Sequence, residues 1–328
     1  MNTKKYLILI VAILLVLSIT VLSLTKQLYV NEVKTLNLDV DQTSISIAPR
    51  IIGEEKGRIY ILQSQNNSII EIAPQSEDTG DSLFLNDYIT READYTAESI
   101  IRDSIIVIDA RVDKETNSIY IFYIHDKTDL SGGDLYSTSY YLAKYALEQK
   151  ILKAEIEFQE NVFVDITNSD IFLYYTNREV NDIYKLEEIE TTFDIVKVFA
   201  GTENEICRLY SDIDLVCKSS QNANELYATS LSKSKEEPTK IFSCPETFCE
   251  KLMGVIGSNI LLYDKSKVHL VTDKKKYSLD LQLSNPDFGT PNTSYSNDKK
   301  YLFLDRKDGI YIIYEVKWQS LLSRILNL

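Results

Sequence analysis

The sequence lacks most of the patterns on which catalysis and cofactor binding depend. It has only two histidines, and it contains no H-E-x-x-H, P-loop, G-x-G-x-x-G or G-x-S-x-G pattern. The Asp boxes of sialidases are absent, and Trp318 is the one tryptophan. Because an active site needs a convergent set of acid, base or nucleophilic groups, these absences argue against an enzyme and against a bound cofactor.

Metal-binding spacing is missing as well. The four cysteines include no C-x-x-C pair, which disfavours a zinc site. They are Cys207, Cys217, Cys244 and Cys249. Calcium has weak candidate ligands in Asp126, Asp129 and Asp134, which surround a Gly-Gly pair. Their spacing does not match the EF-hand loop, so a solvated acidic loop is the better interpretation and no metal is expected.

Positive charge is in the minority. The chain has 35 Lys and Arg residues against 49 Asp and Glu residues, which gives a net charge of −14 at pH 7. A surface of that sign repels phosphate backbones, so nucleic acid is not expected among the partners.

Charge is absent altogether from Tyr6–Leu24, which follows Lys4 and Lys5. As a helix this run would be about 28 Å long, close to the hydrocarbon thickness of a bilayer. No small-residue cleavage site and no lipoprotein cysteine follow it, so an uncleaved anchor is favoured over a signal peptide. Positive residues stay on the cytoplasmic side. The sequence thus predicts a single-pass protein of the cell membrane, with residues 1–5 cytoplasmic, residues 6–24 in the bilayer and the bulk of the chain extracytoplasmic.

Between residues 33 and 315 no helical period appears, and short strand-like runs recur instead. One run, apolar on both faces, returns at intervals of roughly 40 to 60 residues. Its copies are GRIYILQS from Gly57, NSIYIFYI from Asn117, SDIFLYYT from Ser169, DIDLVCKS from Asp212, SNILLYDK from Ser258 and KKYLFLDR from Lys299. The four-stranded blades of β-propellers recur at this interval, and their inner strands are covered on both faces by neighbouring blades.

A second kind of strand alternates between apolar and polar residues. The run ILKAEIEF, residues 151–158, is typical of a half-solvated outer strand. The last repeat ends with Gly309–Val316 and has no such strand after it, but Val33–Val40 shows the alternation before the first repeat. The sequence therefore predicts an all-β fold: a six-bladed β-propeller over residues 33–316, closed by its N-terminal strand and joined to the anchor by a linker, residues 25–32.

A family resemblance points to the same architecture. The stretch SYSNDKKYLFL followed by DGIYIIYEV, within residues 292–316, resembles the TolB-type, WD40-like propeller repeat, whose consensus runs Ser-Pro-Asp-Gly before two hydrophobic strands. Asn297 and Lys299 stand where that repeat has Pro and Gly. The resemblance implies a binding or scaffolding role and carries no catalytic residues. The alternative architecture is a pair of β-sandwich domains.

Within the propeller scheme the cysteines form two local pairs. Cys207 and Cys217 fall on adjacent strands of one hairpin, at equal distances from its turn. Cys244 and Cys249 flank a link between two blades. Because the predicted compartment is oxidising, we expect the disulfides Cys207–Cys217 and Cys244–Cys249.

Two long insertions mark the expected working face. Residues 86–104 link the first two blades, and residues 125–139 link the second and third strands of the second blade. In a propeller both connections lie on one face, and the closing strand starts at the opposite face, near the membrane. Long loops on a rigid scaffold commonly carry binding residues. We expect contacts with a protein or glycan partner, at the membrane-distal face, from Tyr88, Arg91, Tyr95, Asp126 and Tyr136.

The last segment, residues 317–328, has a helical period and predicts a short amphipathic helix. Its apolar stripe either lies in the membrane interface or plugs the underside of the propeller. The stripe includes Trp318, Leu321, Leu322 and Ile325.

Two classes of function remain. The first is a membrane-anchored, extracytoplasmic propeller that binds a protein or glycan partner as a sensor or scaffold. The second is a propeller hydrolase or lyase that acts on a cell-envelope polymer. The second class needs acid and base groups that converge at the central opening, and the inner-strand candidates Asp109, Asp165 and Arg208 do not form an obvious set. The sequence therefore favours the binding module.

Overall fold

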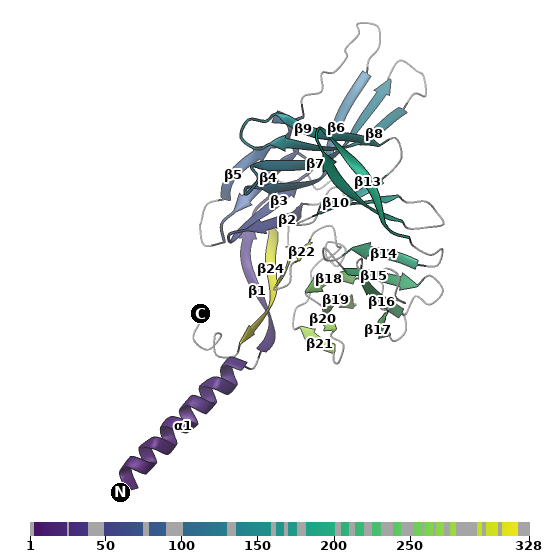
Figure 1. Ribbon diagram of the computed structural model, residues 1–328. Coiled ribbons are helices and arrows are strands. Elements are labelled where there is room, and N and C mark those ends of the chain that lie inside the picture. The colour runs from purple at the N-terminus through teal and green to yellow at the C-terminus, as the bar shows by residue number, and fades with distance from the viewer. Residues whose placement is uncertain are drawn as a thin grey trace.

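The computed structural model describes most of the chain between Thr3 and Ser320. The described residues are 3–24, 26–38, 49–74, 79–89, 101–129, 136–158, 162–166, 170–175, 182–200, 205–209, 214–219, 225–230, 239–243, 252–256, 259–264, 267–271, 276–279, 294–296, 300–307 and 310–320. They form a helix, α1 (Thr3–Leu24), a 3₁₀ turn, η1 (Leu85–Asp87), and antiparallel strands. Figure 1 shows α1 projecting from one end of the β-rich body.

Six four-stranded sheets lie within these residues, and all but one are built from strands that follow one another in the chain. The first sheet holds β2 (Arg50–Glu55), β3 (Arg58–Gln63), β4 (Ser68–Ile72) and β5 (Thr79–Phe84). The second holds β6 (Ile101–Asp113), β7 (Ser118–Asp129), β8 (Tyr136–Ala146) and β9 (Leu152–Phe158). The third holds β10 (Val162–Ile166), β11 (Ile171–Tyr175), β12 (Ile183–Ile189) and β13 (Thr192–Phe199).

The remaining sheets repeat this order. The fourth holds β14 (Glu205–Leu209), β15 (Asp214–Ser219), β16 (Glu225–Ser230) and β17 (Thr239–Ser243). The fifth holds β18 (Leu252–Ile256), β19 (Asn259–Asp264), β20 (Lys267–Val271) and β21 (Lys276–Leu279). The sixth combines β22 (Ser294–Ser296), β23 (Lys300–Lys307) and β24 (Ile310–Ser320) with the N-terminal β1 (Lys26–Leu36).

The recurring apolar run forms the second strand of every sheet, as the sequence predicts. In β3 the side chains alternate between two cores. Ile59 and Ile61 pack in the core shared with the sixth sheet, whereas Tyr60 and Leu62 pack in the core shared with the second sheet. A strand that lies between two neighbouring sheets must be apolar on both faces, which explains the pattern.

Five of the six sheets meet through their innermost strands in the contacts between described residues. Strand β2 contacts β22 on one side and β6 on the other, β6 contacts β10, and β22 contacts β18. Successive four-stranded sheets that pack face to face around their first strands form a β-propeller architecture. The predicted alternative of two β-sandwiches does not describe these sheets, because each sheet is a separate four-stranded unit.

The N-terminus supplies the outer strand of the sixth sheet, also as predicted. Strand β1 pairs antiparallel with β24, from Lys26 opposite Ser320 to Leu36 opposite Tyr311. Leu36 is buried together with apolar side chains of the first and sixth sheets. The predicted bounds were wrong, because the strand begins at Lys26 and not at Val33. The predicted linker, residues 25–32, is therefore largely strand and follows α1 almost directly.

The predicted C-terminal helix over residues 317–328 is wrong in its described part. Strand β24 continues through Trp318, which lies opposite Leu28 of β1. A short apolar run fits a helix and a strand equally well, and the backbone partners that β1 offers decide between them. The other predicted members of the apolar stripe lie outside the described residues; they are Leu321, Leu322 and Ile325.

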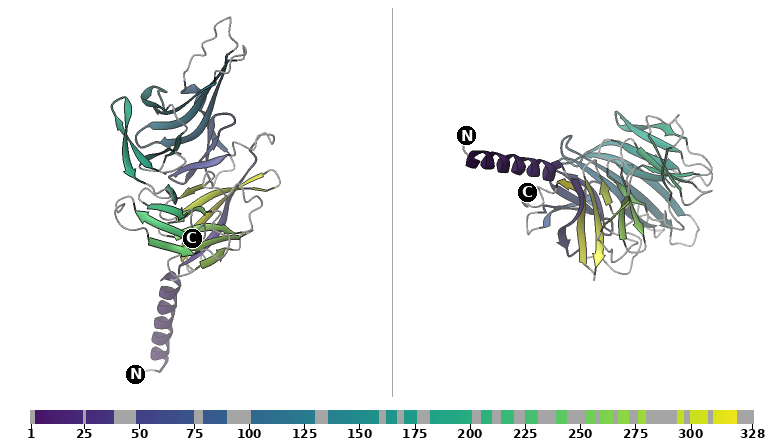
Figure 2. Two further views of the ribbon diagram at one scale, coloured as in Figure 1. Left: turned by 90° about the vertical axis from the view of Figure 1, so that its right-hand side faces the viewer. Right: turned by 90° about the horizontal axis from the view of Figure 1, so that it is seen from below.

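Helix α1 projects away from the sheets (Figure 1, Figure 2). Its described apolar side chains are exposed. These are Val11, Ile13, Leu14, Leu15, Val16, Leu17, Ile19 and Val21. Across the portions of the chain that the structure describes, no helix is both long enough and apolar enough to span a bilayer.

The predicted register of one cysteine pair is confirmed. Cys207 of β14 lies directly opposite Cys217 of β15. Cys244 and Cys249 lie outside the described residues. Both disulfides stay predictions.

Candidate functional site

Three strands of the second sheet extend beyond the fourth strand and form what we call the arm: residues 101–106 of β6, 124–129 of β7 and 136–139 of β8. Pairing runs without interruption from Ile101 opposite Asp129 on one side and from Tyr136 opposite Thr128 on the other. Within the described residues, the pairing of β9 with β8 begins at Phe158 opposite Tyr140. Figures 1 and 2 place the arm at the end of the molecule opposite α1.

An aromatic ladder supports the base of the arm. The rings of Tyr123 and Tyr141 stack with their centroids 5.2 Å apart, and the ring of His125 lies 6.4 Å from that of Tyr141. The Tyr123 hydroxyl donates a hydrogen bond of 2.9 Å to Glu155 on β9. His125 is buried. These contacts join β7, β8 and β9 and hold the base of the arm in position.

The predicted insertion over residues 125–139 is therefore largely sheet and not loop. Asp126 is half-buried on β7 and accepts a hydrogen bond of 2.7 Å from the Thr138 hydroxyl across the strands. Tyr136 begins β8 opposite Thr128. The structure thus brings these two predicted contact residues onto the arm. The predicted contacts Arg91 and Tyr95 lie outside the described residues.

The weak calcium candidates do not come together in the described part of the chain. Asp129 ends β7, and Asp134 lies outside the described residues. No group of three or more His, Cys, Asp or Glu side chains that could hold a metal ion occurs in the regions that the structure covers.

Tyr88 is not a surface residue, which corrects its predicted role as a partner contact. Its side chain is 1% exposed. Its hydroxyl donates a hydrogen bond of 2.6 Å to the carbonyl oxygen of Leu147, and its ring packs edge-on against Tyr145. Lys150 lies over the ring, with its Nζ 5.7 Å from the ring centroid, and pairs with Asp87 at 2.6 Å. Tyr88 thus fastens the segment after the first sheet to the second sheet.

Asn67, which the sequence did not single out as a site residue, fixes the inner strand at the base of the arm. It closes the β3–β4 turn with a left-handed backbone, φ 49°. Its amide nitrogen donates to the carbonyl oxygen of Ile105 at 3.0 Å and to Asn86 at 2.9 Å. Its amide oxygen accepts from the Val107 N–H at 3.1 Å. Asparagine suits the position because it tolerates this backbone and offers both a donor and an acceptor.

Replacing Asn67 by alanine should therefore destabilise the fold. The change leaves the Ile105 carbonyl and the Val107 N–H without their partner, at a cost of about 3 kcal/mol in the free energy of unfolding. Urea titration measures the loss. Asn117→Ala is the matched control for backbone strain alone, since Asn117 has φ 51° in the β6–β7 turn. Equal losses of stability in Asn67→Ala and Asn117→Ala would assign the effect to backbone strain and not to the hydrogen bonds that Asn67 makes with β6.

Three tyrosines make the fold sensitive to alkaline pH. Burial raises the pKa of Tyr88, with a further contribution from Asp87, and it raises the pKa of Tyr314 and of Tyr311, the latter against an opposing effect of Arg306. The folded state therefore favours the protonated phenol. Stability from these groups is complete below the unfolded pKa of about 10 and is lost as the pH rises through the higher folded values.

We expect the urea concentration at the unfolding midpoint to decrease as the pH rises from about 10 to about 11. The decrease should be smaller in Tyr88→Phe than in the unaltered chain. Urea titrations at several pH values, followed by circular dichroism, measure the midpoint in both chains. A midpoint that stays constant to pH 11 in the unaltered chain contradicts the assignment.

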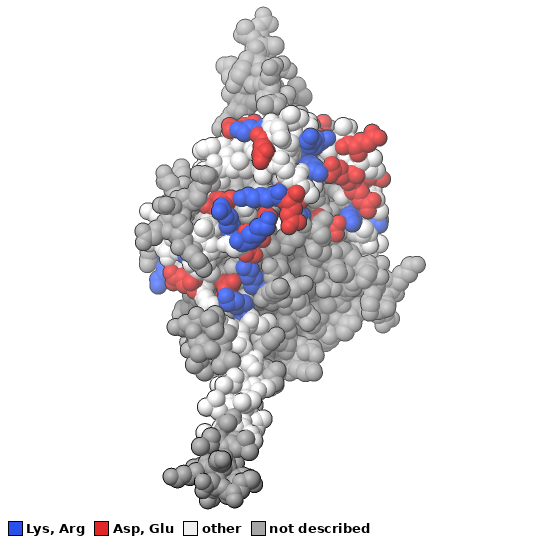
Figure 3. Space-filling view, turned by 60° about the vertical axis from the view of Figure 1, so that its left-hand side comes forward, with Lys and Arg blue, Asp and Glu red and all other residues white. Residues whose placement is uncertain are grey.

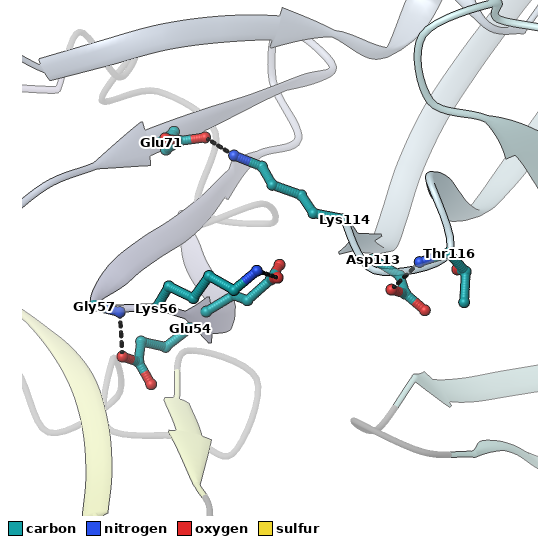
Figure 4. Close-up of polar contacts among 8 residues, drawn as sticks. Glu54, Lys56, Gly57, Glu71, Asp113, Lys114 and Thr116 are labelled. Carbon is teal, nitrogen blue, oxygen red and sulfur yellow. Dashed lines mark hydrogen bonds and ion pairs between the residues drawn. The ribbon is translucent and has the colours of Figure 1, made fainter.

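The face that carries the β2–β3 and β6–β7 turns holds paired charges (Figure 4). Glu71 accepts a hydrogen bond of 2.8 Å from Lys114 (Figure 4). It also pairs with Arg58. Lys300 bridges Glu54 at 3.1 Å and Glu315 at 3.8 Å. On the side shown in Figure 3, basic and acidic side chains are interspersed. On this face the described acidic and basic side chains therefore neutralise one another locally.

The innermost strands contribute one further ion pair. Arg50 of β2 lies 2.8 Å from Asp109 of β6, and Asp109 also accepts the N–H of Ala110 at 2.8 Å. Sequence reasoning noted Asp109 but not Arg50, because nothing local indicates that the two strands are neighbours. The side chains of Asp165 and Arg208 lie outside the described residues.

Comparisons with known proteins yield structural likeness only. No family model matches the sequence, and no curated protein matches it. The AfRom2 CNH domain is 6% identical, with a TM-score of 0.40 over 88% of this chain and 98% of that one. Kluyveromyces lactis Hsv2p is 10% identical, with a TM-score of 0.40 over 80% and 71%. The β-propeller domain of the Trilobed protease from Pyrococcus furiosus is 12% identical, with a TM-score of 0.39 over 84% and 94%. Likeness at these levels assigns no function.

Proposed function

We propose that the chain is a single-pass membrane protein whose extracytoplasmic propeller, of six blades closed by β1, uses the arm to bind a protein or glycan partner. The anchor in this proposal is α1. It is supported by the uncharged run Tyr6–Leu24 and by the exposure of the apolar side chains described from Val11 to Val21.

The position of the arm carries the proposal. It lies at the end of the molecule opposite α1, so a chain anchored by that helix presents the arm away from the membrane (Figure 1, Figure 2). The arm strands β6 and β7 have 13 and 12 residues, whereas the inner strands of the first, third and fourth sheets have 6, 5 and 5. Ile105 at the base of the arm packs against the core of the first two sheets, and the arm strands continue past it, so closing the propeller does not explain their full length.

Binding is favoured over catalysis on the described residues. A hydrolase or lyase of propeller fold would need an available acid or base among the inner strands. The described inner-strand groups Arg50 and Asp109 lie 2.8 Å apart as an ion pair between two sheets. No specific observation favours the catalytic alternative.

Site-specific photo-crosslinking in the full chain, within its native membrane, tests the proposal. A benzoylphenylalanine probe replaces Thr138, which is exposed on the arm, or Glu115, which is exposed in the turn at the other end of β7. The arm probe should give a discrete heavier species on irradiation, and the turn probe should not. Adducts from the turn probe alone would overturn the role of the arm.

A further inference from the structure

The turn between β3 and β4 carries an acceptor pattern for N-linked sugar. Asn66-Asn67-Ser68 has the form Asn-x-Ser with a residue other than proline in the middle, which is the acceptor sequence for N-glycosylation. The pattern occurs a second time in the chain as Asn292-Thr293-Ser294, whose asparagine lies outside the described residues. The copy in the β3–β4 turn is therefore the one whose surroundings the structure gives.

The two reacting side chains of this pattern are in contact. The Ser68 hydroxyl donates a hydrogen bond of 2.6 Å to the side-chain oxygen of Asn66. A donor at the oxygen of an amide draws electron density from its nitrogen, which makes the N–H protons more acidic. Because the contact joins residues two positions apart, it needs no neighbouring sheet and is available to the chain before the propeller folds.

The timing matters because Ser68 is only 2% exposed in the folded protein. A transferase that reads the serine must therefore meet the pattern before the first sheet closes over it. The folded turn then has to accommodate the sugar on Asn66.

The surroundings of Asn66 meet that requirement. Its side chain is exposed, whereas Asn67 and Ser68 are buried. Its amide nitrogen donates to the side-chain oxygen of Gln63 at 3.3 Å. An unmodified asparagine amide has two N–H groups and a glycosylated one keeps a single N–H, so the bond to Gln63 is compatible with the sugar.

We propose that Asn66 is N-glycosylated on the extracytoplasmic side of the membrane, with a lipid-linked sugar diphosphate as the donor. The bond between the anomeric carbon of the sugar and the phosphate oxygen breaks, and its electron pair leaves with the diphosphate. A bond forms between that carbon and Nδ2 of Asn66, and the displaced amide proton passes to a base of the transferase. The proposal rests on the proposed function, because it requires the chain beyond α1 to be extracytoplasmic.

The sugar stands beside the base of the arm, next to β6. Asn67, which follows Asn66 directly, donates to the Ile105 carbonyl oxygen and accepts from the Val107 N–H. A bulky, hydrated group at this turn covers the surface between the first sheet and the arm. A large partner then reaches the arm from its other sides.

Peptide mapping of the full chain, purified from its native membrane, tests the proposal. Trypsin releases residues 59–91 as one peptide, because no Lys or Arg lies between Arg58 and Arg91. Mass spectrometry should find this peptide heavier than its sequence by the mass of a sugar chain, with the added mass on Asn66. The peptide of residues 115–127 is the internal control, since its Asn117 is followed two positions later by Ile119 and should be unmodified.

Variants of the pattern assign the added mass. Asn66→Gln changes an exposed side chain and should lose the mass. Ser68→Ala should lose it as well, whereas Ser68→Thr keeps the hydroxyl and should keep the mass. An unmodified Asn66 in the unaltered chain, or added mass that persists in Ser68→Ala, overturns the proposal.

An amine reagent that does not cross membranes, applied to intact cells, separates this failure from failure of the proposed function. Lys56 has a side chain that is 77% exposed, so the reagent should label it if the propeller is extracytoplasmic. A labelled Lys56 with an unmodified Asn66 refutes the glycosylation alone. An unlabelled Lys56 with an unmodified Asn66 refutes both the glycosylation and the extracytoplasmic position.

Discussion

A chain that lacks residues 1–38 should melt more than about 10 °C below a chain that begins at Lys26. The deletion removes β1, whose backbone pairs with β24 along most of its length. It also removes Leu36 and Leu38, which are 2% and 6% exposed and lie in the core between the first and sixth sheets. Losing two buried leucines costs about 2–5 kcal/mol each, and 1 kcal/mol corresponds to roughly 2–4 °C in a domain of this size.

Differential scanning calorimetry of the two chains measures the difference. The chain that begins at Lys26 controls for the loss of α1 itself. Leu36→Ala with Leu38→Ala in the full-length chain separates the lost core packing from the opened edge of β24. If the shortened chain melts at the same temperature as the control, the N-terminal strand does not close the sixth sheet.

Tyr88→Ala should lower the free energy of unfolding by about 3–5 kcal/mol, the usual cost of removing a large buried aromatic side chain. The tyrosine is 1% exposed, packs edge-on against Tyr145 and donates a hydrogen bond to the Leu147 carbonyl oxygen. Tyr88→Phe keeps the ring and removes only the hydrogen bond, so its cost should be about 1 kcal/mol.

Urea unfolding of the two variants, followed by circular dichroism, measures both losses. Phe84→Ala is a matched control close by in the chain, because Phe84 is 54% exposed, and it should change stability by no more than about 0.5 kcal/mol. A Tyr88→Ala chain as stable as the unaltered protein would restore the interpretation of Tyr88 as a surface contact.

The repeating part of the fold could be predicted because its strands carry their own signal. The second strand of each sheet, such as β3, is apolar on both faces because two sheets cover it, and this pattern returns in every repeat. The missing outer strand of the last repeat pointed to the N-terminus, and β1 does pair with β24. The register of Cys207 with Cys217 followed from the same hairpin symmetry.

The parts that could not be predicted depend on partners far away in the sequence. Trp318 sits in a run with a helical period, and only the presence of Leu28 on β1 makes that run a strand. The arm strands gave no strand signal, because residues outside the core need no apolar alternation. The sequence around Tyr88 predicts a loop, and its burial depends on packing against residues of the second sheet. No pattern in the sequence around Asn67 predicts that its side-chain amide forms hydrogen bonds with β6.

We propose that α1 holds the protein at a membrane and that the arm stands away from it. Energy transfer from a dye on the protein to acceptors on lipid headgroups tests this most directly, with the full chain in vesicles. The dye is placed at Gln319, which lies opposite Gln27 close to α1, or at Thr138 on the arm. Transfer from Gln319 should be strong and transfer from Thr138 weak. Equal transfer from both positions, or stronger transfer from Thr138, would contradict the account.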